Sequence, residues 1–393
     1  MVSYRNYQLR TLARPDGYTG LDRLEATLPK RWYIDPSQYA RELKHIWYRN
    51  WLYVCRADAL PEPGSFKTYE IGDQNVLLVK DRHGEIRAFH NTCRHRGSRL
   101  VNQPEGRLGA LALTCPYHAW VYKLDGRLFK TPNLMDDGGL DKSLYGLFPV
   151  ALKNWRGFLF LCLAENPPPF EDMFNGAENL FANWPLEDLV VGHRATLSLA
   201  CNWKLFWDNF NECLHCPGVH PSLSELVPIY GRGITGLKDD PKWKEKAEVQ
   251  DPRYRGGIRT GAATWSMDGQ LQGPVFPGLS DDERRIGALY MTLLPTGYWV
   301  CHPDYVRAVR IMPTGPTTTE LHVEWLFARE ALDMPGFDMS KIVDFVLSFL
   351  REDGGICEVN QLGLSALPFD EGVLLPPEYA VKDFQDWVRK QLR

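Results

Sequence analysis

The chain has 393 residues, with 45 lysines and arginines against 49 aspartates and glutamates, and a formal net charge of −4. This near balance leaves no basic surface for nucleic acid and no polybasic patch for a membrane. The first residues lack a signal peptide, and the longest apolar stretches, such as residues 157–163, are too short to cross a bilayer. Nine cysteines, an odd number, then indicate reduced thiols and metal ligands in a cytosolic protein, not a disulfide framework.

The length predicts two domains, at roughly 100–200 residues each. Residues 1–45 are expected to form an N-terminal segment that packs on the second domain, with a helix that begins near Asp35-Pro36-Ser37. Residues 46–165 contain short β-type runs separated by turns, for example at 75–79 and 86–89. This pattern predicts an all-β module.

Three consecutive prolines, Pro167 to Pro169, mark the boundary after this module, because proline continues neither a strand nor a helix. Residues 166–393 follow as a second domain of mixed structure. Apolar spacing there predicts strands near 193–201 and 286–329, and helices near 203–215 and 339–363.

Two short motifs in the β module carry two cysteines and two histidines. Cys93-Arg94-His95 is C-x-H, and after nineteen intervening residues Cys115-Pro116-Tyr117-His118 is C-x-x-H. In a Rieske-type [2Fe–2S] cluster two cysteines bind one iron and two histidines bind the other, so each loop contributes one residue of each kind. Zinc sites more often take a cysteine pair from one loop and a histidine pair from the other. The pattern favours the iron–sulfur cluster, with zinc as the alternative.

A second set of metal-binding side chains begins at Glu212. Glu212 and His215 are three positions apart, so on a helix they share one face. His215 and His220 are five apart, and Pro217-Gly218 is expected to break the helix between them and bring His220 back toward His215. Two imidazoles and one carboxylate, with coordination positions left open, form the facial triad of mononuclear Fe(II) oxygenases.

The carboxylate of such a triad can come from far along the chain. The late helical segment contains several acidic residues, and Asp353 is our choice among them. Glu352, Glu358 and Asp344 compete with it, because spacing alone does not separate the four.

Residues 231–236 match G-x-G-x-x-G, the pattern of a dinucleotide-binding loop. Such a loop must open a helix inside a βαβ unit, and residues 237–241, which end in proline, do not form an amphipathic helix. A flexible lid or loop near the pocket is therefore expected here. Without a flavin or nicotinamide module in the chain, electrons from NAD(P)H must arrive through a separate reductase or ferredoxin.

In this order and spacing, the motifs resemble those of the α subunits of Rieske non-haem iron ring-hydroxylating oxygenases. The resemblance runs from about Tyr33 to the end and includes Asn202-Trp203-Lys204, an acidic residue before H-x4-H, and a late Asp followed by x-x-x-C-E. It implies an α+β chain with an antiparallel β Rieske [2Fe–2S] domain. A helix-grip catalytic domain with a large antiparallel sheet is implied to follow it.

The resemblance also implies roles for single residues. His215, His220 and Asp353 are implied to bind the mononuclear Fe(II). Glu212 is implied to be the acidic bridge between two metal sites of neighbouring chains in a head-to-tail homotrimer. Electrons then pass from His118 of one chain through Glu212 to His215 of its neighbour.

Within the family, Glu-Cys-x-His-Cys-Pro-x-x-His-Pro and His302-Pro303-Asp304 are most similar to the branch that acts on quaternary ammonium compounds, such as glycine betaine, stachydrine and carnitine. Leu214 departs from that branch, which usually has tyrosine there. The implied function is a terminal oxygenase that hydroxylates a small molecule with O₂, with N-demethylation where an N-methyl carbon is attacked.

Two other functions stay open: an aromatic-ring dioxygenase acting on an aromatic acid, and a non-enzymatic Rieske electron carrier. Four aromatic residues are candidates for a cation-binding cage, although core packing is the favoured interpretation for each: Trp265, Tyr290, Trp299 and Tyr305.

Overall fold

The computed structural model describes residues 20–132, 134, 139–233 and 251–393. The chain divides into two compact units: unit 1 contains residues 1–42, 177–292 and 297–393, and unit 2 contains residues 43–176 and 293–296. Among the described residues, no helix is both long and apolar enough to cross a bilayer.

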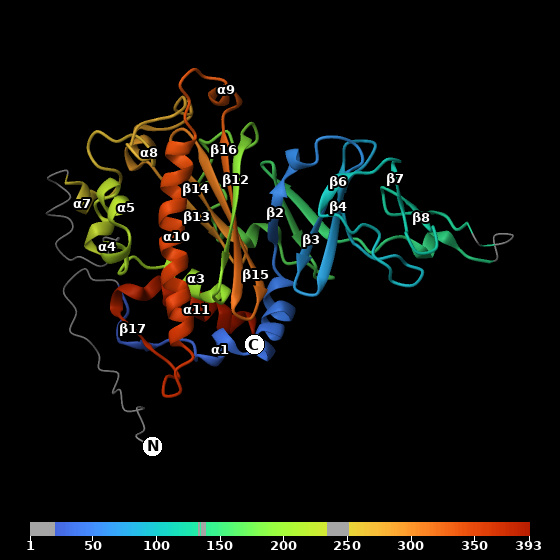
Figure 1. Ribbon diagram of the computed structural model, residues 1–393, viewed down its shortest axis with the longest axis horizontal. Coiled ribbons are helices and arrows are strands. Elements are labelled where there is room, and N and C mark those ends of the chain that lie inside the picture. Colours follow the sequence, from blue (N-terminus) through green and yellow to red (C-terminus); the bar gives the residue numbers. More distant parts are fainter. Residues whose placement is uncertain (1–19, 133, 135–138, 234–250) are drawn as a thin grey trace. The chain divides into compact units, whose positions relative to one another are not determined.

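Unit 2 is a β module, drawn mainly in blue to green in Figure 1. Its strands form three antiparallel sheets, in the orders β5-β4-β3-β6, β7-β8-β9 and β10-β11-β2. Its strands are β2 Leu52–Arg56, β3 Ser65–Ile71, β4 Gln74–Lys80, β5 Ile86–His90, β6 Glu105–Arg107, β7 Ala112–Thr114, β8 Val121–Lys123, β9 Leu128–Lys130, β10 Ala151–Trp155 and β11 Phe158–Cys162. Its helical turns are η1 Leu43–Trp47, η2 Ala57–Ala59, η3 Lys142–Tyr145 and η4 Phe170–Phe174.

The β4–β5 hairpin shows how the sequence shapes this module. Asp81 closes the turn, because its Oδ1 accepts the backbone N–H groups of His83 (2.8 Å) and Glu85 (3.1 Å). Gly84 has φ +88°, a conformation that glycine adopts without steric cost. The strands expected at 75–79 and 86–89 are thereby confirmed.

Unit 1 is built around a five-stranded sheet in the order β12-β16-β15-β14-β13. The pairs β12–β16, β16–β15 and β15–β14 are antiparallel. Its strands are β1 Glu25–Ala26, β12 Val190–Leu199, β13 Leu289–Leu293, β14 Gly297–Cys301, β15 Val306–Gly315, β16 Thr318–Phe327 and β17 Val373–Leu374. Its helices are α1 Arg31–Ile34, α2 Pro36–Glu42, α3 Trp203–Phe210, α4 Cys216–Val219, α5 Pro221–Leu226, α7 Pro252–Arg255, α8 Asp281–Ile286, α9 Arg329–Leu332, α10 Ser340–Gly363 and α11 Tyr379–Gln391, with short turns η5 Tyr230–Arg232 and η7 Pro376–Glu378.

The long helix α10 runs beside the sheet and packs against β12 and α3 (Figure 1). Its inner side is apolar, with Ile342, Val346 and Leu350 fully or almost fully buried. Because α3 also packs against α11 and β15, the end of α3 and the middle of α10 are held on the same part of the unit. The residues that follow α3 and Asp353 of α10 are therefore held close to one another.

The helix expected at 203–215 is shorter in the structure. It begins at Trp203, where the Asn202 side chain accepts the N–H of Lys204 (3.0 Å), and it ends at Phe210. Pro217 does not break a helix, since it lies in the first turn of α4. Backbone N–H groups in a first turn have no partner within the helix, so proline costs no hydrogen bond there. The chain bends instead at residues 211–214 and at His220, which has φ −117° and ψ 70°.

Candidate functional site

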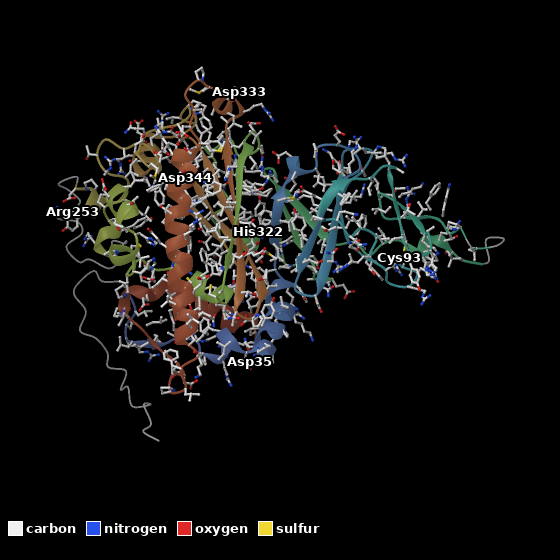
Figure 2. The ribbon with its side chains drawn as sticks, in the orientation of Figure 1. Asp35, Cys93, Arg253, His322, Asp333 and Asp344 are labelled. Atoms are coloured by element: carbon white, nitrogen blue, oxygen red, sulfur yellow. A yellow bond between two sulfur atoms is a disulfide. The ribbon has the colours of Figure 1, made fainter. Side chains whose placement is uncertain are left out.

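Two loops of unit 2 bring together the first set of candidate ligands. Cys93 and Cys115 are free thiols that are 3% and 2% exposed, whereas His95 is exposed and His118 half-buried. The two imidazole rings lie 4.6 Å apart between centroids. Figure 2 labels Cys93 within the β module. Each loop therefore presents one inner sulfur and one outer nitrogen.

Hydrogen bonds hold the shape of these loops. The N–H of Gly97 donates to the carbonyl of Cys93 (3.0 Å), and that of Ala119 donates to the carbonyl of Cys115 (3.1 Å). The Tyr122 hydroxyl lies 3.2 Å from the Cys93 sulfur and accepts the N–H of Arg94 (3.0 Å). Apart from the contact of Tyr122 with the Cys93 sulfur, these bonds do not involve the four candidate side chains.

The pairing of donors bears on the two metal groups that the sequence left open. Each loop supplies one cysteine and one histidine, whereas zinc sites more often take a cysteine pair from one loop and a histidine pair from the other. Two buried thiols and two outer imidazoles suit a two-iron cluster with mixed ligands.

The second set meets in unit 1, where residues after α3 face helix α10. His220 Nε2 lies 2.9 Å from Asp353 Oδ1, and His215 Nε2 lies 3.4 Å from the same oxygen. The two imidazole rings are 5.2 Å apart. Asn209 of α3 donates to Asp353 Oδ1 at 2.6 Å and orients it. All three expected ligand side chains are therefore gathered at one point.

A carboxylate holds the other nitrogen of each histidine. His215 Nδ1 lies 2.5 Å from Glu212 Oε1, and His220 Nδ1 lies 2.7 Å from Glu352 Oε2. Such partners fix the orientation of an imidazole and raise its basicity as a metal ligand. Glu352 thus contacts the far side of His220, and Glu358 accepts the N–H of Ala200. Of these acidic residues, Asp353 is the one that lies between both imidazoles.

The pKa values of His215 and Asp353 show that this site favours positive charge. Burial disfavours the protonated imidazole of His215, but the carboxylates of Asp353 and Glu212 outweigh it and raise the pKa to about 9. Burial likewise works to raise the pKa of Asp353, but hydrogen bonds from His215 and His220 hold it below its ordinary value. Three carboxylates, those of Glu212, Glu352 and Asp353, surround two imidazoles, a set that suits a divalent cation.

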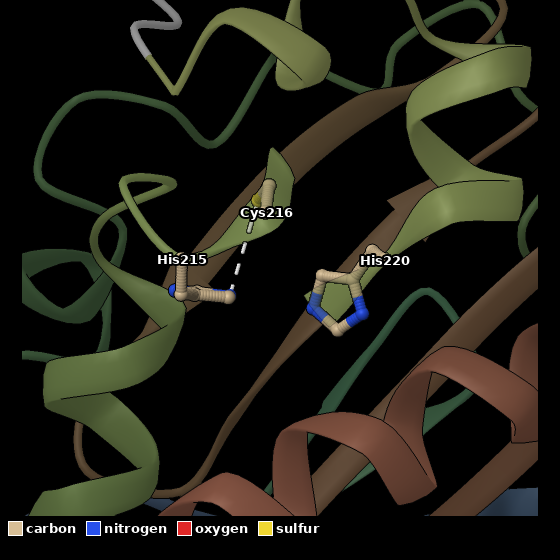
Figure 3. Close-up of side chains that lie close together, drawn as sticks. All are labelled: His215, Cys216 and His220. Atoms are coloured by element: carbon tan, nitrogen blue, oxygen red, sulfur yellow. Dashed lines mark hydrogen bonds between the residues drawn. The ribbon is translucent and has the colours of Figure 1, made fainter. Parts of the chain in front are cut away.

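Cys213 and Cys216 differ from the expectation of reduced thiols throughout the chain. They form a disulfide with Cα atoms 5.0 Å apart, because the turn after α3 folds the backbone over three positions. The Cys216 sulfur lies 3.9 Å from His215 Nε2, and Figure 3 shows it near the imidazoles of His215 and His220. Since this sulfur is bonded to Cys213, it offers no thiolate to a metal, and Asp353 completes the donor set better.

A cavity of about 620 Å³ opens on these side chains within unit 1. Its walls are largely aromatic: besides the candidate metal ligands it is lined by Phe210, Tyr230, Trp265, Tyr290, Tyr298 and Phe349. Of the four residues considered for a cation cage, Trp265 and Tyr290 line this cavity, whereas Trp299 and Tyr305 are completely buried outside it. Most of the expected lid at 231–236 lies outside the described residues, which stop at Gly233.

Comparison with known proteins agrees with this geometry. The family "Ring hydroxylating alpha subunit (catalytic domain)" matches residues 186–393, and the "Rieske [2Fe-2S] domain" matches residues 50–145. The chain belongs to the family of ring-hydroxylating oxygenase α subunits. It is 32% identical to the glycine betaine monooxygenase oxygenase subunit of Chromohalobacter salexigens, over 92% of this chain and 84% of that protein.

Two further relatives support the same placement. The carnitine monooxygenase oxygenase subunit of Acinetobacter baumannii is 26% identical, over 90% of this chain and 89% of that one. A solved quaternary ammonium Rieske monooxygenase has a TM-score of 0.74 at 22% identity and covers 94% of this chain and 96% of its own. The expected fold, a Rieske domain and a catalytic domain with a large antiparallel sheet, is confirmed.

Membership of the family establishes the type of enzyme. The oxygenase carries a Rieske cluster and a mononuclear iron and takes electrons from a separate donor, as expected. The alternative hypothesis of a non-enzymatic Rieske electron carrier is excluded, because the chain also contains the catalytic domain. Sequence reasoning missed the roles of Asn209 and Glu352, although Glu352 stood out as an acidic neighbour of Asp353.

Proposed function

We propose that this oxygenase hydroxylates a betaine or another quaternary ammonium compound at a carbon next to nitrogen. One atom of O₂ enters a C–H bond as C–OH and the other leaves as water, with two electrons from NAD(P)H through a separate reductase and two protons. Where the carbon is an N-methyl group, the N–CH₂OH product releases formaldehyde and leaves the tertiary amine.

One observation carries this proposal: the aromatic cavity opens directly on His215, His220 and Asp353. Aromatic faces bind quaternary ammonium groups through their quadrupole, and they also exclude water from the reacting carbon. The named activities of the relatives, on glycine betaine and carnitine, support the same substrate class. The departure at Leu214, exposed at the end of the turn, leaves the aromatic lining intact.

In this proposal His215, His220 and Asp353 would hold the iron, which would supply the activation of O₂. Glu212 and Glu352 keep both Nδ1 atoms engaged, so that the Nε2 atoms are the ones that would bind a metal. Asn209 holds the Asp353 carboxylate in place.

The cluster would be held by Cys93 and Cys115 on the inner iron and by His95 and His118 on the outer one. The exposed position of His95 and the half-buried position of His118 suit electron entry and exit at the surface. The domain limits 1–45, 46–165 and 166–393 belong to this proposal.

Electron transfer between chains is the remaining part of the proposal. In a head-to-tail homotrimer the electron passes from His118 of one chain through Glu212 to His215 of its neighbour. Support comes from Glu212, which is bonded to His215 and keeps 14% of its side chain exposed. The proposed location of the assembly is the cytosol.

Product analysis with the full holoenzyme and a reductase tests the function. With glycine betaine or carnitine we expect an aldehyde and an amine in proportion to O₂ consumed, namely formaldehyde and the demethylated amine where an N-methyl carbon is attacked, and neither product with the Asp353→Ala variant. A cis-dihydroxylated product from an aromatic acid, with no reaction of any N-methyl compound, would instead establish the ring dioxygenase alternative.

A further inference from the structure

Among the described residues, Arg307 is the one charged side chain of the cavity wall that is not part of the candidate metal site. It lies on β15, is 1% exposed, and lines the same cavity as Asp353. Its guanidinium carbon lies 5.1 Å from the ring centre of Phe349, 5.9 Å from that of Tyr298 and 6.0 Å from that of Trp265. The guanidinium is therefore surrounded by the faces of aromatic rings and is shielded from bulk water.

This guanidinium has no anionic partner among the described residues. Its Nε and Nη1 atoms are buried and make no hydrogen bond. Asp353 does not supply one, because its Oδ1 is engaged by Asn209, His215 and His220 and no ion pair joins it to Arg307. Aromatic contacts offset part of the loss of water, but they satisfy none of the directional N–H donors.

Other buried ionisable side chains of unit 1 have polar partners within the chain. Lys204 and Glu42, both completely buried, form an ion pair at 2.7 Å. Asp304, 1% exposed, accepts a hydrogen bond from the Thr264 hydroxyl (2.6 Å) and from the N–H of Gln272 (2.9 Å). Since an arginine cannot lose its proton to escape burial, an unpaired guanidinium at a cavity wall is a site prepared for an anion from outside.

We propose that Arg307 binds a carboxylate of the substrate. The planar fork of a guanidinium matches the two oxygens of a carboxylate, and the dry aromatic surroundings strengthen that bond. Taken together with the proposed action on quaternary ammonium compounds, on which this step rests, the substrate is a zwitterionic betaine. A purely cationic compound of choline type is disfavoured, because it would meet the Arg307 charge without an anion to neutralise it.

The same residue also limits where the cationic end of the substrate lies. The faces of Trp265 and Tyr298 are already next to the guanidinium. Tyr230 and Tyr290, whose hydroxyls are 3.3 Å apart, line the cavity without such a contact and offer the remaining faces to a methylammonium group.

Binding measured without turnover tests the proposal. Oxidised holoenzyme is titrated calorimetrically with glycine betaine, its carboxamide, choline and benzoate. We expect glycine betaine to bind roughly 10- to 100-fold more tightly than the carboxamide, the range for a hydrogen-bonded charge pair. Arg307→Met should reduce this ratio to about 1 by removing that pair, and Arg307→Lys should restore part of it.

The matched control is Arg310→Met, on the same strand but outside the cavity lining, which should keep the wild-type ratio. A carboxamide that binds wild type as well as glycine betaine, or a ratio that survives in Arg307→Met, overturns the inference and leaves the oxygenase function standing. Arg307-dependent binding of benzoate, with no binding of any ammonium compound, supports the carboxylate site and overturns the proposed substrate class.

Thermal unfolding of the ligand-free holoenzyme gives a readout that needs no ligand. If Arg307 awaits an anion, its unpaired charge costs stability, so Arg307→Met should melt at the wild-type temperature or above. A structural guanidinium would instead make Arg307→Met melt several degrees lower than both wild type and Arg310→Met, and that result overturns the inference.

Discussion

The two candidate metal sites are assembled in different ways. In unit 2 both loops belong to one small β module, and the four side chains follow each other between Cys93 and His118. In unit 1 the Asp353 carboxylate comes from helix α10, 133 positions beyond the His220 that it approaches. The first site depends on local turns, and the second depends on how α10 packs against α3 and the sheet. Variants should therefore damage the two sites separately.

The largest effect is expected from Asp353→Ala. Water does not replace the anionic contribution of the carboxylate, so the variant should lose the mononuclear iron and all product while the visible spectrum of the cluster stays intact. Metal analysis should fall from about three irons per chain to about two, since a Rieske cluster holds two and the triad one. Glu358→Ala, on the same helix, is the control that should keep all three.

The counterpart in unit 2 is His95→Cys. A thiolate donates more negative charge than an imidazole, so the cluster potential should fall by roughly 100–350 mV, about half of the difference between Rieske clusters and clusters with four cysteines. Redox titration followed by EPR measures the shift, while the mononuclear iron content should not change. A cluster that assembles with an unaltered potential would show that His95 is not a ligand.

Glu212→Gln probes the proposed route between the sites. Both metal groups should assemble, because Glu212 is a ligand of neither, but the amide loses the charge and one acceptor that hold His215 Nδ1. Stopped-flow mixing of the reduced cluster with O₂ and substrate should show much slower reoxidation. Glu225→Gln, an exposed glutamate of α5, is the matched control. Reoxidation of Glu212→Gln at the wild-type rate would leave the bridge without support.

The contrast between the sites also explains what the sequence could predict. The four candidate cluster residues were predicted from spacing alone, and two short loops of one module bring them together. His215 and His220 were predicted as ligands too, and the structure brings them together, but the predicted helix over them was wrong: α3 ends at Phe210, and a turn places Glu212 against His215. The prediction from residue types therefore did not depend on where the helix ends.

Features that depend on packing between distant segments could not be predicted. Adjacent residues on α10 point about 100° apart around the helix axis, since a turn takes 3.6 residues. Glu352 and Asp353 thus reach opposite nitrogens of His220, which only the placement of α10 decides. The isolation of Arg307 is equally invisible in sequence, because it depends on which side chains fail to reach it.

The smallest effect is expected from Glu352→Gln, which tests the placement behind His220. Glu352 keeps 37% of its side chain exposed, so water can replace part of its bond to His220 Nδ1. An amide oxygen still accepts that hydrogen bond but no longer carries the charge that makes the imidazole more basic. We expect iron affinity about 10-fold lower, the lower end of the range for such partners, with the cluster unaffected.

Competition with a chelator measures this affinity, and added iron should restore turnover in Glu352→Gln but not in Asp353→Ala. That difference follows from geometry: Glu352 acts through His220, whereas Asp353 lies between both imidazoles. If Glu352→Gln lost iron irreversibly while Asp353→Ala kept it, Glu352 would be the ligand, and α10 would have to be rotated by one residue about its axis.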